Sequence, residues 1–100
     1  MKIPTSIKVG RKKYSVTQVK HMPKKGIMGS TSYGNKAIMV ATHSNVRNVR
    51  FKREEVYDTF WHELTHAILQ DMGSKLEGDE EFVTAFSERL TKAIISARFD

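Results

Sequence analysis

The sequence of 100 residues contains no cysteine, only two prolines and no long apolar run. Without cysteine, the chain can form neither disulfides nor thiolate zinc sites, so any metal must take nitrogen and oxygen ligands. No segment has enough apolar residues to span a bilayer, and the N-terminus lacks the apolar run of a signal peptide. We therefore expect one domain, residues 1–100, in the cytoplasm and without a membrane partner.

Acidic residues are missing from the first half of the chain. Residues 1–53, the basic half, carry 13 Lys or Arg and no Asp or Glu, whereas residues 54–100, the acidic half, carry four Lys or Arg and all 11 acids. Such segregation is typical of a surface that binds nucleic acid or another acidic partner. It is equally compatible with a basic half that folds against an acidic half. No basic helix or aromatic stacking motif decides between the two interpretations.

The basic half is patterned as short strands. Apolar and polar residues alternate on both sides of a turn at residues 10–13, which predicts a first hairpin over residues 7–19. A second hairpin is predicted over residues 27–42, with its turn at residues 33–35. Its second strand holds the apolar run 37–41 and is either an edge strand beside a site or, as its composition favours, a buried central strand.

The acidic half has a helical period instead. A first helix is predicted from Glu54 to the stop at Gly73 and a second from Asp79 to Ala97, joined by a short turn that makes them roughly antiparallel neighbours. The fold class is therefore α+β, with a small antiparallel sheet followed by two helices. The expected buried sides are Val56, Phe60, Leu64, Ala67 and Ile68 on the first helix, and Val83, Phe86, Leu90, Ala93, Ile94 and Ala97 on the second.

The first helix contains the pentapeptide His62-Glu63-Leu64-Thr65-His66. Residues four apart lie one above the other on a helix, so both imidazoles point the same way and can share one metal ion. Glu63 projects from the flank of that face, where it can hold a metal-bound water without ligating the metal. This pattern is typical of zinc peptidases. The alternative is two histidines that merely share a helix.

Catalytic zinc needs a third protein ligand, and carboxylates cluster at the start of the second helix, at Asp79, Glu80 and Glu81. Glu80 lies on the edge of the predicted buried side, about 100° from its centre. Glu81 points nearly away, and Asp79 suits the N-cap. Helix phase therefore favours Glu80 as the third ligand, with Glu81 as the alternative. The remaining histidines, His21 and His43, lie in the basic half.

Residues 60–69 and 79–86 together resemble the small phage-type zinc metallopeptidases of the gluzincin-like group, and more distantly the SprT-like and ImmA/IrrE-like peptidases. The resemblance implies a minimal zincin-like fold with an active-site helix and a C-terminal backing helix, and a host-cell cytoplasmic location if the chain is phage-encoded. It also implies His62, His66 and Glu80 as ligands and Glu63 as the catalytic base. The chain lacks the subdomain that forms the far wall of the cleft in larger zincins.

The leading hypothesis is a zinc-dependent metallopeptidase that binds one Zn²⁺ per chain and cuts a peptide or protein substrate through a zinc-bound water activated by Glu63. One alternative is a metal-binding regulatory module without turnover. Another is a nucleic-acid-associated peptidase that uses the basic half. Asp58 could orient His62 as a hydrogen-bond acceptor. An oxyanion donor could come from Tyr33, Tyr57 or His43, although no spacing argument favours any of them.

Overall fold

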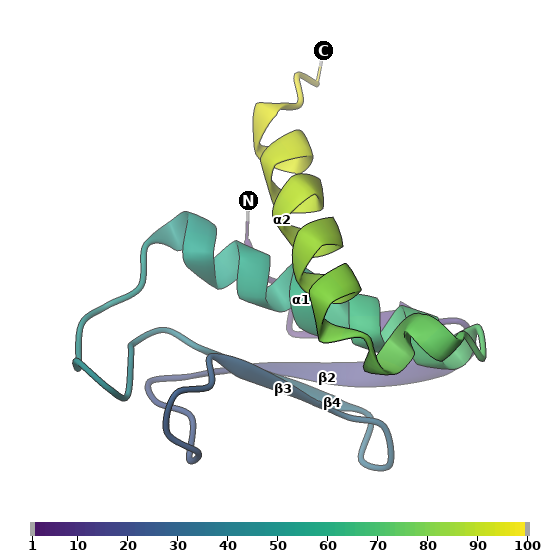
Figure 1. Ribbon diagram of the computed structural model, residues 1–100, viewed down its shortest axis with the longest axis horizontal. Coiled ribbons are helices and arrows are strands. Elements are labelled where there is room, and N and C mark those ends of the chain that lie inside the picture. Colours follow the sequence, from purple (N-terminus) through teal and green to yellow (C-terminus); the bar gives the residue numbers. More distant parts are fainter. Residues whose placement is uncertain (1, 100) are drawn as a thin grey trace.

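A computed structural model describes residues 2–99 as a four-stranded sheet followed by two helices (Figure 1). The α+β fold class is thereby confirmed. In the described part of the chain, no helix combines the length and apolar character needed to cross a membrane. The elements are β1 (Ser6–Val9), β2 (Lys12–Val19), β3 (Gly29–Ser32), β4 (Ala37–Ala41), α1 (Arg53–Asp71), the short 3₁₀ helix η1 (Lys75–Gly78) and α2 (Glu80–Ser96).

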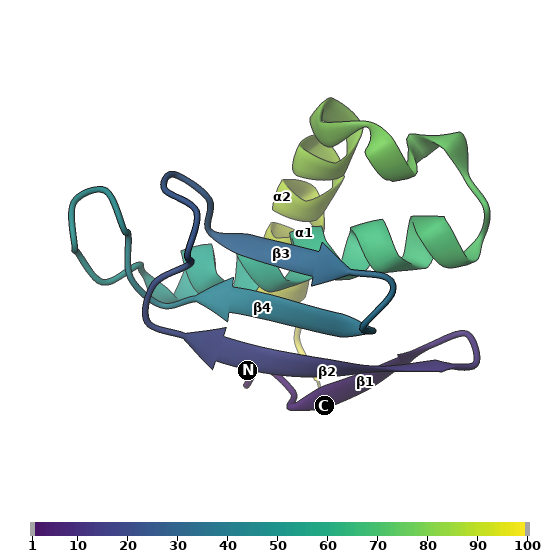
Figure 2. The same cartoon turned by 90° about the horizontal axis from the view of Figure 1, so that it is seen from below.

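The strands lie in the order β1-β2-β4-β3, as Figure 2 shows. Both predicted hairpins form, because β1 pairs with β2 and β3 pairs with β4 in antiparallel fashion. The prediction of a wholly antiparallel sheet is wrong, since β2 and β4 run parallel, with Val16 opposite Ile38. The chain leaves β2, passes to the far edge as β3 and returns as β4 between β3 and β2. The apolar strand β4 is therefore central, and β3 is an edge strand.

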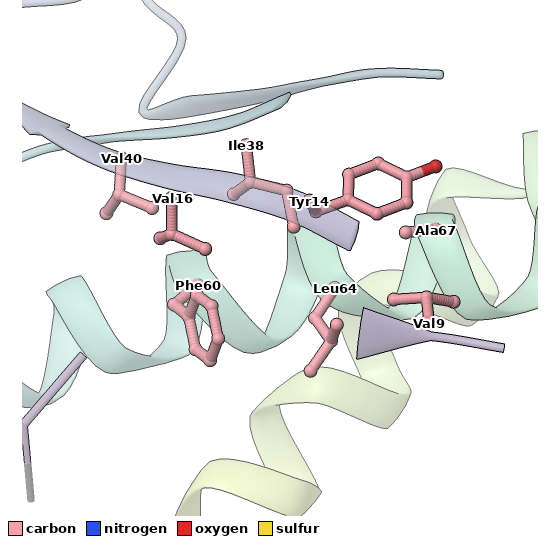
Figure 3. Close-up of a cluster of buried hydrophobic side chains, with 8 residues drawn as sticks. All are labelled: Val9, Tyr14, Val16, Ile38, Val40, Phe60, Leu64 and Ala67. Carbon is pink, nitrogen blue, oxygen red and sulfur yellow. The ribbon is translucent and has the colours of Figure 1, made fainter. Parts of the chain in front are cut away.

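Helix α1 covers one face of this sheet and contributes Phe60, Leu64 and Ala67 to the core between them (Figure 3). In β2, Tyr14 and Val16 are buried while Ser15 and Thr17 are exposed, as expected for a sheet with one covered face. The side chains of the core cluster are Val9, Tyr14, Val16, Ile38, Val40, Phe60, Leu64 and Ala67.

The ends of α1 follow from local sequence. The side chain of Glu55 accepts the backbone N–H of Lys52 at 2.9 Å, which satisfies one free backbone donor at the N-terminus of the helix. Gly73 has a φ of 68°, the left-handed conformation that commonly ends a helix. The predicted extent of this helix is confirmed to within a residue or two. The prediction that Ile68 is buried is wrong, because it is 42% exposed.

Helix α2 begins where Asp79 accepts the backbone N–H of Phe82 at 3.0 Å, as an N-cap. Its buried residues are Val83, Ser87 and Thr91, and the predicted stripe through Phe86 is wrong, since Phe86 is 46% exposed. The small polar side chains are accommodated because the hydroxyl of Thr91 donates to the Ser87 carbonyl at 2.8 Å. Figure 1 shows α2 crossing α1 steeply, so the expected antiparallel arrangement is not formed.

Candidate metal centre

The two histidines of the pentapeptide lie one turn apart on α1, on the flank between the sheet and α2. Their ring centroids are 5.0 Å apart. His66 is only 9% exposed, and His62 is partly buried. The predicted shared face therefore exists, opposite the buried Leu64 and Ala67.

The first residue of α2, Glu80, reaches back to both imidazoles. Its Oε2 lies 3.1 Å from Nε2 of His62, and its Oε1 lies 2.6 Å from Nε2 of His66. One ligand atom from each of the three residues falls within 4.8 Å of the others, a spacing that can hold one metal ion. Glu81 is exposed and does not belong to this group. The structure thus brings together the two histidines of the pentapeptide and the glutamate that helix phase favours.

A backbone contact fixes the tautomer of His66. Its Nδ1 lies 2.8 Å from the carbonyl oxygen of Glu77 in η1. A carbonyl only accepts, so Nδ1 carries the hydrogen and Nε2 of the neutral ring keeps a lone pair. That lone pair faces an oxygen of Glu80 at 2.6 Å, and two acceptors so close repel unless a proton or a metal cation lies between them. The donor set therefore fits a metal, with Glu77 as the outer partner that orients a ligand.

Glu63 is 8% exposed and stands beside this group without being part of it. Burial raises the pKa of its carboxyl group, and the hydrogen bond from Thr31 and the two nearby imidazoles lower it in part. Thr31 Oγ1 lies 2.8 Å from Oε1 of Glu63 and 3.0 Å from the Glu63 carbonyl, so β3 is bound to α1 at this residue. No sequence pattern signals this contact, which joins residues 32 positions apart.

A cleft of about 550 Å³ surrounds these side chains. Its floor is α1, one wall is the segment 26–29 that leads into the edge strand β3, and the other wall is α2. The lining residues are Gly26, Ile27, Met28, Gly29, Asp58, Thr59, His62, Glu63, His66, Glu80, Thr84 and Glu88. A short loop and one helix thus form the two walls of the cleft.

Several other candidates from the sequence lie elsewhere or are engaged. Asp58 lines the cleft, but its Oδ1 accepts the hydroxyl of Thr91 at 3.2 Å and makes no hydrogen bond to His62. The hydroxyl of Tyr33 donates to Glu77 Oε2 at 3.1 Å, and burial followed by that hydrogen bond raises its pKa. The three remaining candidates, Tyr57, His21 and His43, do not line the cleft.

No family model, curated protein or solved structure matches the chain. The functional argument therefore depends on the geometry of the centre and on the chemistry of its residues.

Proposed function

We propose that the chain is a zinc-dependent metallopeptidase of the gluzincin-like type. The observation that carries this proposal is the position of Glu63, a buried carboxylate beside a group of three metal-ligating side chains but outside it. A purely structural metal site needs no base at that position. The raised pKa of Glu63 is also suited to a group that takes up and releases a proton.

Zinc is the metal that this donor set suits best. Two imidazole nitrogens and one carboxylate oxygen form the three-ligand set of catalytic zinc sites, which keep a fourth position open. Magnesium and calcium prefer oxygen ligands throughout, so His62 and His66 disfavour them. The chain's contribution is to hold the three ligands with one imidazole oriented by the Glu77 carbonyl.

When bound, zinc would lower the pKa of a coordinated water and polarise the scissile carbonyl. Glu63 accepts the proton of the attacking water and delivers it to the leaving amide nitrogen. Thr31 donates to Oε1 of Glu63, which leaves Oε2 to carry that proton. Because Glu63 is buried, bulk water does not compete for the proton that it carries.

The edge strand β3 suggests how a peptide substrate is held. Its partner β4 occupies only one of its two edges, and the segment before it forms a wall of the cleft. An extended peptide can pair with such an open edge through main-chain hydrogen bonds, which bind without regard to side-chain identity. The substrate class is therefore an extended or unfolded peptide segment.

The test compares hydrolysis of a fluorogenic peptide library by the zinc-loaded wild type and by Glu63→Gln. Glutamine keeps the shape of the side chain and its Oε1 still accepts from Thr31, so zinc content is expected to stay unchanged. The rate is expected to fall at least about 100-fold, the usual effect of losing a general base.

Glu81→Gln is the matched control, since it removes an exposed carboxylate close to the centre and should leave the rate unchanged. Equal rates for wild type and Glu63→Gln, at equal zinc content, would contradict catalysis and favour a metal-binding regulatory module.

A further inference from the structure

Direct ion pairs engage few of the positive charges of the basic half. Within residues 2–99, the only ion pair between a Lys or Arg and a carboxylate joins Lys12 Nζ and Asp71 Oδ1, at 3.8 Å. The two other ion pairs both belong to the metal centre, between its histidines and Glu80. The basic half does fold against the acidic half, since α1 packs on the sheet, but few of its cations are held in direct ion pairs. Arg47 and Lys52 share a hollow with four carboxylates, those of Glu54, Glu55, Asp58 and Glu88.

Many of these cations gather on two loops at one end of the sheet. Loop 20–28 follows β2 and loop 42–52 follows β4, and because these strands are parallel the two loops leave the same end (Figure 2). We call this region the basic end. Its cations are Lys20, Lys24, Lys25, Arg47, Arg50 and Lys52.

Asn45 holds the two loops together. Its Nδ2 donates to the carbonyls of Met22 at 2.7 Å and Lys24 at 2.9 Å, and its Oδ1 accepts the backbone N–H of Gly26 at 2.9 Å. A second link joins His21 Nε2 and Asn48 Oδ1 at 2.8 Å. The cations of the basic end therefore sit on a defined surface and not on independent loops.

Next to the basic end lies a hollow of about 740 Å³. Lys2, Arg50 and Arg53 line it together with Phe51, and no carboxylate is among its lining residues. The pKa of the nearby His43 is lowered, first by partial burial and then by the positive charges of Lys20 and Arg50. Like charges are thus held close together around a space that has polar and aromatic walls.

We propose that the basic end and the adjoining hollow bind the phosphodiester backbone of a nucleic acid. A phosphodiester chain presents regularly spaced negative charges that match cations spread over two loops, and it can enter a hollow. Only two small apolar side chains, Val46 and Val49, are strongly exposed on loop 42–52, which is little for insertion into a bilayer. This inference is independent of the metal centre.

The experiment measures binding of the full chain to a labelled single strand and to the matching duplex, by fluorescence anisotropy from about 50 to 200 mM salt. The double variant Arg47→Gln/Arg50→Gln is compared with Lys8→Gln/Lys13→Gln. The second pair removes the same charge from facing positions on β1 and β2, away from the two loops. All four side chains are exposed, so folding should be unaffected.

We expect the Arg47/Arg50 variant to lose about tenfold in affinity and to lower the salt slope by about 1.5, while the Lys8/Lys13 variant stays close to wild type. The single strand and the duplex distinguish the two forms of the same backbone. Absence of binding at the lowest salt, or equal loss in both variants, would overturn the proposal. So would equally tight binding of poly-glutamate of matched charge, or binding to anionic vesicles but not to nucleic acid.

Discussion

Replacement of Gly29 by alanine tests how tightly β3 is seated against α1. A Cβ atom at Gly29 would lie 2.7 Å from Cγ2 of Thr59, 2.9 Å from the carbonyl oxygen of Met39 and 3.2 Å from Cγ of Glu63. The Met39 oxygen belongs to the backbone of the central strand and cannot move alone. Thr59 cannot rotate freely either, because its hydroxyl donates to the Glu55 carbonyl at 3.0 Å. Relief must come from movement of β3 away from both α1 and β4.

That movement has a predictable size and consequence. Overpacking of this kind destabilises the fold by about 1–3 kcal/mol. Alanine also restricts the unfolded chain more than glycine does, which stabilises the fold by about 0.4–1 kcal/mol. Gly29→Ala should therefore lower the free energy of unfolding by roughly 1–2 kcal/mol, or the melting temperature by about 4–8 °C per kcal/mol. It should also loosen the hydrogen bond from Thr31 to Glu63 and reduce peptidase activity in fully folded protein.

Urea unfolding followed by circular dichroism measures the stability, and peptide hydrolysis measures the activity. Gly34→Ala is the matched control, because a Cβ atom there meets nothing within 4 Å and the backbone is not left-handed. It should be neutral or slightly stabilising. If Gly29→Ala proved as stable and as active as Gly34→Ala, the tight contact between β3 and α1 would be refuted.

Three further predictions concern the centre itself. Glu80→Gln should weaken zinc binding by about 100-fold, because zinc–protein binding free energies of about 10–16 kcal/mol, divided over four ligands, give roughly 3 kcal/mol for each ligand. The control Glu81→Gln should leave the affinity unchanged. Equal affinities of the two variants in a zinc-competition titration would show that Glu80 is not a ligand. Thr31→Val removes a hydrogen bond that lowers the pKa of Glu63, so the acidic limb of the pH–rate profile should move to higher pH, whereas the exposed control Thr17→Val should not shift it. The pKa of Glu63 is raised in the folded state. The favourable contribution of this carboxyl group to the free energy of unfolding is therefore present below its unfolded pKa of 4.5 and is lost as the pH rises through its folded pKa. Without metal, Glu63→Gln should therefore unfold at a higher urea concentration than the wild type at neutral pH, and this difference in urea midpoint should vanish below about pH 4. A difference in midpoint that stays the same at acidic pH would contradict the burial of the Glu63 charge.

The helical half was the more predictable part of the fold. Spacing alone placed His62 and His66 on one face, and helix phase selected Glu80 over Glu81. The phase argument selected the glutamate that lies beside both imidazoles, although the stripe behind it was partly wrong. Apolar periodicity could not foresee that Ser87 and Thr91, with their hydroxyls satisfied by the preceding turn, would be buried in place of Phe86.

Two features of the sheet and centre lay beyond sequence reasoning. Alternation of apolar residues shows which face of a strand is buried, but it is the same for parallel and antiparallel neighbours, so the pairing of β2 with β4 could not be read from it. The contact that orients His66 uses the carbonyl of Glu77, a backbone atom that every residue has. Only the position of η1 brings it to the ring.

The most direct test of the account is the metal content of the purified full chain after dialysis against zinc. The account predicts one zinc per chain, lost in His62→Ala and in His66→Ala and kept in Glu63→Gln and Glu81→Gln. A folded wild-type protein that retains no zinc, or His62→Ala and His66→Ala variants that retain it as the wild type does, would contradict the proposed metal centre.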